Sequence, residues 1–67
     1  MRRDMKVREV IRLLEQNGWA LVRTKGSHRH FRHSVKPGTV TVAGKMGLDV
    51  PIGTLNSILK QAGLNRQ

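Results

Sequence analysis

The chain has no cysteine among its 67 residues, and this absence constrains most strongly how it can fold. Small domains often gain stability from disulfides or from a cysteine-ligated zinc ion. Neither a disulfide framework nor a zinc finger is possible here, so one hydrophobic core must hold the fold. A chain this short buries only about 60% of its unfolded surface and cannot support two cores. We therefore treat residues 1–67 as a single domain.

Basic side chains greatly outnumber acidic ones. Thirteen Lys and Arg against four Asp and Glu give a formal net charge of +9. This charge on so small a surface favours a polyanionic partner, with nucleic acid as the first candidate. Binding to an anionic membrane surface would need a long amphipathic helix with a wide apolar face, and neither end of the chain supplies one.

No apolar run is long enough to cross a membrane. Residues 19–22 form one of the longest runs, whereas a spanning helix needs roughly 20 apolar residues. Residues 1–4 are basic, but the apolar stretch of a secretory signal does not follow them. We therefore expect a soluble, cytoplasmic protein without a membrane partner.

Hydrophobic periodicity predicts the order of the secondary structure. Apolar residues at helical spacing predict the two helices, and β-branched or aromatic residues bounded by turns predict the strands. Gly18 fits a helix stop, Gly26 and the pair Pro37-Gly38 fit turns, and Pro51 fits the first turn of a helix. The expected elements are a helix over 7–17, strands over 19–24, 28–33 and 39–42, and a helix over 51–62.

The expected order is α-β-β-β-α, which defines an α+β domain. Each helix has one apolar stripe, and the antiparallel three-stranded sheet has one apolar face, so both helices should pack on the same face of the sheet. The other face is then left to solvent. Residues 44–50 are polar and rich in glycine, which predicts irregular structure, and residues 65–67 are expected to fray.

Few residues can perform chemistry on a phosphodiester. Cleavage needs either metal ions on carboxylates or a group that titrates near neutrality beside cations. The four carboxylates are scattered along the chain, which argues against a two-metal nuclease and predicts no metal site and no cofactor. Histidine can take and return a proton at cellular pH, and all three histidines fall within residues 28–33.

Strand alternation divides residues 28–33 between the two faces of the sheet. His28, His30 and Arg32 are expected on the open face, and Arg29, Phe31 and His33 on the other. Phe31 should enter the core. Trp19 is also expected in the core, because a chain with one Trp, one Phe and no Tyr offers no aromatic platform for stacked bases.

His28 is the candidate catalytic residue. Gly26 allows backbone to approach a ligand closely, and the hydroxyl and N–H of Ser27 can bond a phosphate oxygen. As a hypothesis, His28 removes the proton from a ribose 2′-OH, which then attacks the adjacent phosphorus, so DNA would not be cut. The other residues expected to contact RNA are Arg23, Lys25, Arg29, His30, Arg32 and Lys45. The competing interpretation is an ordinary surface histidine among solvated charges.

Four segments, taken together, resemble the HicA toxin family along nearly the whole chain. They are Arg-Glu-Val-Ile-Arg-Leu-Leu at 8–14, Asn-Gly-Trp at 17–19, Arg-Thr-Lys-Gly-Ser-His at 23–28 and Gly-Thr-Leu-Asn-Ser-Ile-Leu-Lys-Gln-Ala-Gly-Leu at 53–64. Each segment alone is a weak motif. Their order and spacing are specific.

The resemblance implies a double-stranded-RNA-binding-like fold and a metal-independent mRNA interferase, with His28 as the catalytic histidine of the Gly-Ser-His motif. It also implies an antitoxin partner, HicB, that covers this histidine in a regulated growth-arrest module. Many relatives carry a proline and another histidine after the third strand, where residues 43–46 are Ala-Gly-Lys-Met. A second histidine role is therefore not carried over, and whether Lys45 replaces it stays open.

Two other functions compete with the ribonuclease. A non-catalytic module for double-stranded RNA would share the fold. Such domains usually place lysines at the start of the second helix, where residues 49–54 are nearly uncharged. A DNA-binding regulator with a helix-turn-helix would need two close helices, but a long stretch of predicted strand separates them here.

Overall fold

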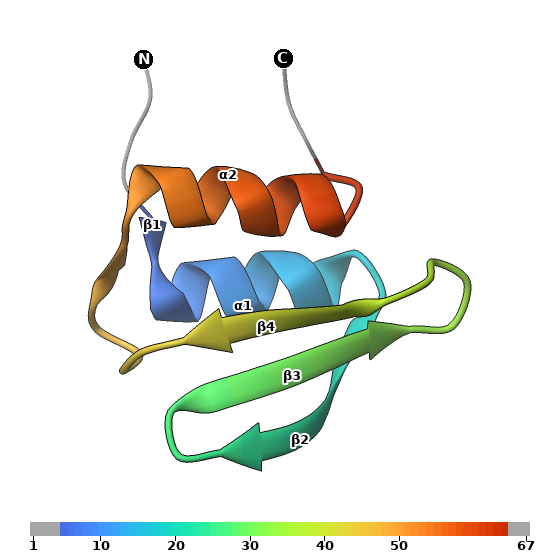
Figure 1. Ribbon diagram of the computed structural model, residues 1–67, viewed down its shortest axis with the longest axis horizontal. Helices are drawn as coiled ribbons and strands as arrows, with labels where there is room; N and C mark the ends of the chain where they lie inside the picture. The colour runs from blue at the N-terminus through green and yellow to red at the C-terminus, as the bar shows by residue number, and fades with distance from the viewer. Residues whose placement is uncertain (1–4, 65–67) are drawn as a thin grey trace.

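The computed structural model describes residues 5–64, which form two helices and two antiparallel sheets (Figure 1). In chain order the elements are β1 (Met5–Lys6), α1 (Val7–Gln16), β2 (Trp19–Lys25), β3 (His28–His33), β4 (Thr39–Ala43), β5 (Asp49–Val50) and α2 (Ile52–Gln61). The two helices and the three longer strands follow the predicted α-β-β-β-α order, so the α+β class is confirmed. The expectations for residues 1–4 and 65–67 lie outside the described residues.

The larger sheet has the strand order β2-β3-β4, and both pairs are antiparallel. A two-residue turn joins β2 to β3, and Gly26 takes a positive φ of 61° within it. Residues 34–38 connect β3 to β4 and include Gly38 at a φ of 86°. Both are positions where a residue without Cβ avoids a steric penalty, as the turn predictions assumed.

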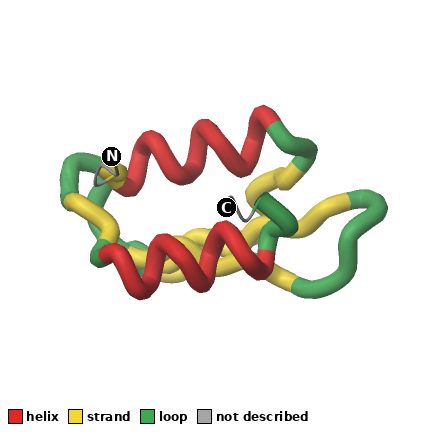
Figure 2. The backbone as a smooth tube through the Cα atoms, turned by 90° about the horizontal axis from the view of Figure 1, so that it is seen from above, coloured by secondary structure: helices red, strands yellow, loops and turns green. Residues whose placement is uncertain are grey.

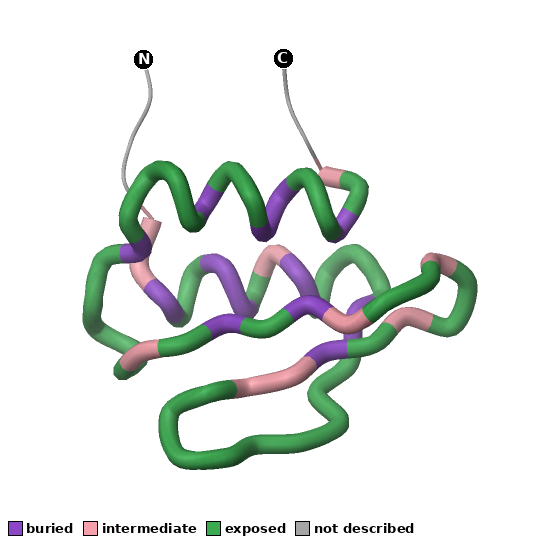
Figure 3. The backbone as a smooth tube through the Cα atoms, in the orientation of Figure 1, coloured by how far each residue is buried: buried purple, intermediate pink, exposed green. Residues whose placement is uncertain are grey.

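One hydrophobic core lies between the helices and the inner face of this sheet (Figure 3). The two helices run in the same direction, α1 across the inner face and α2 along the β4 side (Figures 1 and 2). The core residues are Val7, Val10, Ile11, Leu14, Trp19, Phe31, Val40, Val42, Val50, Leu55, Ile58, Leu59 and Ala62. Trp19 and Phe31 therefore belong to the core, as predicted. Ile52, the first residue of α2, is apolar but 44% exposed.

Residues 44–48 are irregular as predicted, but Asp49–Val50 form a short strand, so the prediction was wrong for these two residues. β5 pairs with β1 beside the start of α1. The first N–H groups of a helix have no partner within it. Here Leu48 O accepts the N–H of Val7 at 2.8 Å, and Met46 O accepts the N–H of Arg8 at 3.1 Å. The side-chain composition of residues 44–50 did not predict this pairing or these bonds, because both use backbone atoms only.

Gly18, which follows the end of α1, is a position where alanine should be costly. Its φ is 91°, and a Cβ there would lie 2.6 Å from Nε2 of His33. We expect Gly18→Ala to lose about 1–2 kcal/mol of unfolding free energy through the positive φ, and about 1 kcal/mol more by displacing the His33 hydrogen bond. Urea denaturation measures the combined loss of unfolding free energy. Gly38→Ala is the matched control, because its φ is 86° but no atom lies within 4 Å of the added Cβ. Equal losses would contradict a role for the imidazole contact.

Candidate functional site

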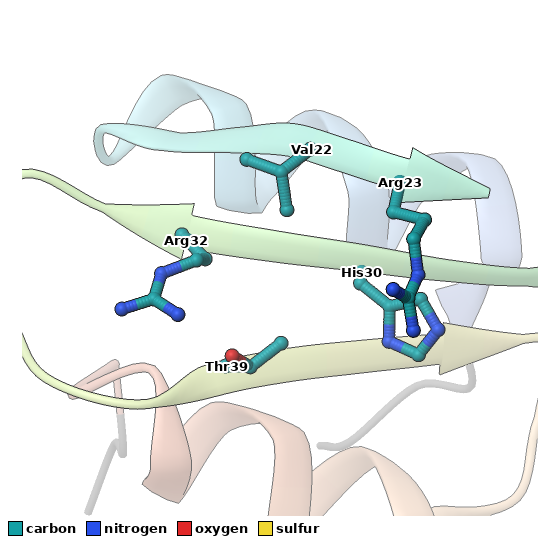
Figure 4. A pocket seen from close by; sticks show the side chains of 5 residues that line it. All are labelled: Val22, Arg23, His30, Arg32 and Thr39. Atoms are coloured by element: carbon teal, nitrogen blue, oxygen red, sulfur yellow. The ribbon is translucent and has the colours of Figure 1, made fainter.

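The candidate site lies on the outer face of the sheet, which is the face turned away from the helices. Phe31 is completely buried on the inner face, whereas His30 and Arg32, its neighbours along β3, line a pocket on the outer face (Figure 4). His28 lies two residues before His30 and is exposed. The predicted alternation of β3 is thus observed.

A β-bulge in β2 brings Arg23 to this outer face. Leu21 pairs with Phe31 and Arg23 pairs with His30, so Val22 is the extra residue between them. Val22 and Arg23 consequently line the same pocket. Strict alternation from Leu21 would have placed Arg23 on the inner face. Nothing in the apolar run before Arg23 predicts the bulge, so sequence reasoning missed it.

Lys25, Gly26 and Ser27, which were predicted around His28, lie beside it at one end of the sheet. His28 pairs with Lys25 across the turn and with Ala43 of β4. The N–H of Gly44 donates to Ser27 O at 3.2 Å, which places the start of the Lys45 segment beside the turn. A Cβ at Gly26 would meet no atom within 4 Å, so the space beside the turn is open to a ligand.

The three histidines have different surroundings. Within residues 5–64 the imidazole of His28 has no hydrogen-bond partner, and it is exposed. Nδ1 of His30 is 2.9 Å from Oγ1 of Thr41, a contact that fixes the ring against β4. His28 is therefore the one of the three histidines whose ring makes no hydrogen bond to a described residue.

His33 has a structural role. Its Nδ1 accepts the N–H groups of Val35 at 2.9 Å and Lys36 at 3.1 Å, and its Nε2 lies 3.0 Å from Asn17 O. Because Nδ1 accepts twice, the proton is assigned to Nε2, which donates to the carbonyl. The ring also packs edge-on against Trp19 with centroids 5.2 Å apart. These contacts tie the end of β3 to the turn after α1.

Arg29 is the one predicted RNA contact that lies on the inner side of the sheet. Its partner in β4 is the buried Val42, and its Nη1 donates to Gly44 O at 3.1 Å. This bond holds the segment after β4. Contact of Arg29 with RNA stays a prediction, and its position separates it from His30 and Arg32.

Three cations, Arg23, Lys25 and Arg32, lie on the outer face of the sheet, and the carboxylates of the described residues lie elsewhere. Glu9 and Glu15 belong to α1, and Asp49 lies in β5, where it pairs with Lys6 at 3.2 Å. No cluster of three His, Asp or Glu side chains within residues 5–64 could hold a metal ion. None of the helices in this part of the chain is long and apolar enough to cross a membrane.

Fold and site together define a small α+β domain that presents histidine and clustered cations on an uncovered sheet face. A family model described as the HicA toxin of bacterial toxin-antitoxin systems matches residues 7–64. The chain therefore belongs to the HicA toxin family. Toxins of this family pair with an antitoxin and are generally ribonucleases. A comparison with curated proteins gives no match.

Proposed function

We propose that this toxin is a metal-independent endoribonuclease, an mRNA interferase, that cuts RNA with His28. The observation that carries the proposal is an exposed histidine without a protein partner in the described structure. It lies beside an open glycine turn and opposite Lys25, and the segment that leads to Lys45 is bonded to the same turn. A histidine in such surroundings can exchange protons with a ligand whose phosphate the neighbouring cations hold.

His28 acts first as a base and then as an acid. It takes the proton from a ribose 2′-OH, and the 2′-oxygen forms a bond to the adjacent phosphorus. The bond from phosphorus to the 5′-oxygen breaks, and that oxygen receives the proton back from His28. The products are a 2′,3′-cyclic phosphate and a 5′-hydroxyl. Lys25, Lys45 and the N–H of Ser27 stabilise the charge on the phosphate in the transition state.

A site of this kind supports slow cleavage. One general base contributes a factor of roughly 10² to 10⁴. Cellular RNA is the substrate, which places the activity in the cytoplasm. The partner we propose is a HicB-like antitoxin that covers His28 and thereby blocks access of RNA to it.

A non-catalytic module for double-stranded RNA is a weaker explanation. The beginning of α2, Ile52-Gly53-Thr54, offers no cation for a phosphate. Three cations, Arg23, Lys25 and Arg32, lie instead on the outer face of the sheet, together with His28 and His30. This distribution favours a strand of RNA lying on the sheet.

The mechanism is tested with three oligonucleotides of one sequence in excess EDTA. We expect the RNA to be cleaved, while DNA and an RNA with a 2′-O-methyl group at the cleaved position are bound but uncut, because neither offers a 2′-OH there. Mass spectrometry should find a 2′,3′-cyclic phosphate on the 5′ fragment. Cleavage that disappears in EDTA, or that persists at the 2′-O-methyl position, would contradict the mechanism.

A further inference from the structure

The outer face is hollowed into a pocket next to, but separate from, His28. The pocket has a volume of about 310 Å³ and is lined by Val22, Arg23, His30, Arg32 and Thr39 (Figure 4). This volume lies at the small end of the range for ligand pockets, about 300 to 1,000 Å³. His28 is not among the lining residues. It lies two residues before His30 in β3, on the same face.

The pocket presents mainly hydrogen-bond donors. Within residues 5–64 neither Arg23 nor Arg32 has an ion pair or a side-chain hydrogen bond, so both guanidinium groups are available to a ligand. Nδ1 of His30 is occupied by Thr41, which leaves its Nε2 as the ring atom that a ligand can reach. Two cations face one pocket, and no carboxylate of the described residues lines it. Such an arrangement favours an anion.

We infer that this pocket binds a phosphate of a single RNA strand, next to the phosphate that is cleaved at His28. The inference rests on the proposed function, since it takes RNA as the substrate. Alternate residues of a strand are about 6.8 Å apart, so His28, His30 and Arg32 form a line of donors along β3. This spacing is comparable to that of successive phosphates in an extended single strand. Val22 provides an apolar wall for the sugar.

A carboxylate-rich peptide is the other anion that paired arginines can bind. RNA is favoured because the pocket lies in line with His28 on the same strand. One polymer with evenly spaced phosphates reaches both positions at once. The consequence is that the toxin grips at least two neighbouring phosphates and selects unpaired RNA that can lie flat on the sheet.

The test measures binding to a fully 2′-O-methylated oligonucleotide, which cannot be cut, by fluorescence anisotropy at fixed salt. A neutral methylphosphonate is moved through each linkage in turn. For the wild type, one linkage beside the cleaved one should lose about tenfold or more in affinity when neutralised. Arg32→Gln should lose a similar factor on the fully charged oligonucleotide and become less sensitive to that methylphosphonate, because only Arg23 then faces the phosphate. Arg23→Gln should behave in the same way.

Arg12→Gln is the matched control, because Arg12 is exposed on α1 and its loss removes the same charge far from the sheet. Circular dichroism establishes that each variant is folded. The inference is overturned if Arg32→Gln binds RNA no more weakly than Arg12→Gln. It is equally overturned if the affinity lost by the methylphosphonate and the affinity lost by Arg32→Gln are additive, because the two changes would then act at separate places. It is also overturned if an acidic peptide displaces the oligonucleotide in an Arg32-dependent way while no single methylphosphonate lowers the affinity. Since this assay involves no cleavage, a failed subsite and a failed ribonuclease are distinguishable.

Discussion

Replacing His28 by alanine should lower the rate of RNA cleavage by about 10²- to 10⁴-fold, the range that a general base contributes, while RNA affinity stays within a few-fold of the wild type. The imidazole of His28 supports no other described residue, so its loss removes proton transfer and little else. Single-turnover cleavage in excess EDTA measures the chemical step, and anisotropy with an uncut oligonucleotide measures binding.

Two further variants make this result specific to proton transfer. His28→Gln keeps a polar side chain that can hydrogen-bond to phosphate but cannot titrate near neutrality, so it should be nearly as slow as His28→Ala. Arg12→Gln, which removes a distant charge, should cleave at close to the wild-type rate once RNA is saturating. Cleavage by His28→Ala within a few-fold of the wild type would exclude His28 as the base.

Replacing Phe31 by alanine should lower the free energy of unfolding by about 3 to 5 kcal/mol, as expected for removing a fully buried aromatic side chain. Phe31 lies in the central strand and has no exposed surface. Domains of this size have a total free energy of unfolding of only about 3 to 10 kcal/mol, so the variant should be marginally stable or unfolded. Urea denaturation followed by fluorescence is suitable, because the buried Trp19 is the only tryptophan.

Leu21→Ala is the matched control for this prediction. Leu21 is the β2 partner of Phe31 but remains 48% exposed at the edge of the sheet. Its truncation should cost no more than about 1 kcal/mol, since less surface is returned to water and no closed cavity forms. Similar losses for the two variants would mean that burial in this sheet does not determine its stability.

The helices and the three longer strands could be predicted because local periodicity reports directly on burial. Val7, Val10, Ile11 and Leu14 occupy one helical stripe, and all four are buried. The small sheet of β1 and β5 could not be predicted in this way. It depends on backbone bonds between segments far apart in the chain, and the side chains of these two-residue strands carry no periodic pattern.

The candidate site could be predicted only in part, because local sequence patterns do not report contacts between segments that are distant in the chain. Alternation assigned His28, His30 and Arg32 to one face, because one residue determines the orientation of the next in a regular strand. The pocket also needs Arg23, whose orientation depends on one extra residue at Val22. Likewise, the bond from Arg29 to Gly44 O depends on where the chain goes after β4. Neither follows from local sequence.

The hairpin formed by β2 and β3 has an uneven distribution of burial along its length. Trp19 and Phe31 fix its base in the core, but every residue of β2 after Trp19 is exposed. Substitutions on the distal part therefore change what the surface recognises and leave the packing that maintains the fold intact. If this surface binds RNA as proposed, point mutations in this half of the hairpin can change which RNA is preferred without a compensating change elsewhere in the domain.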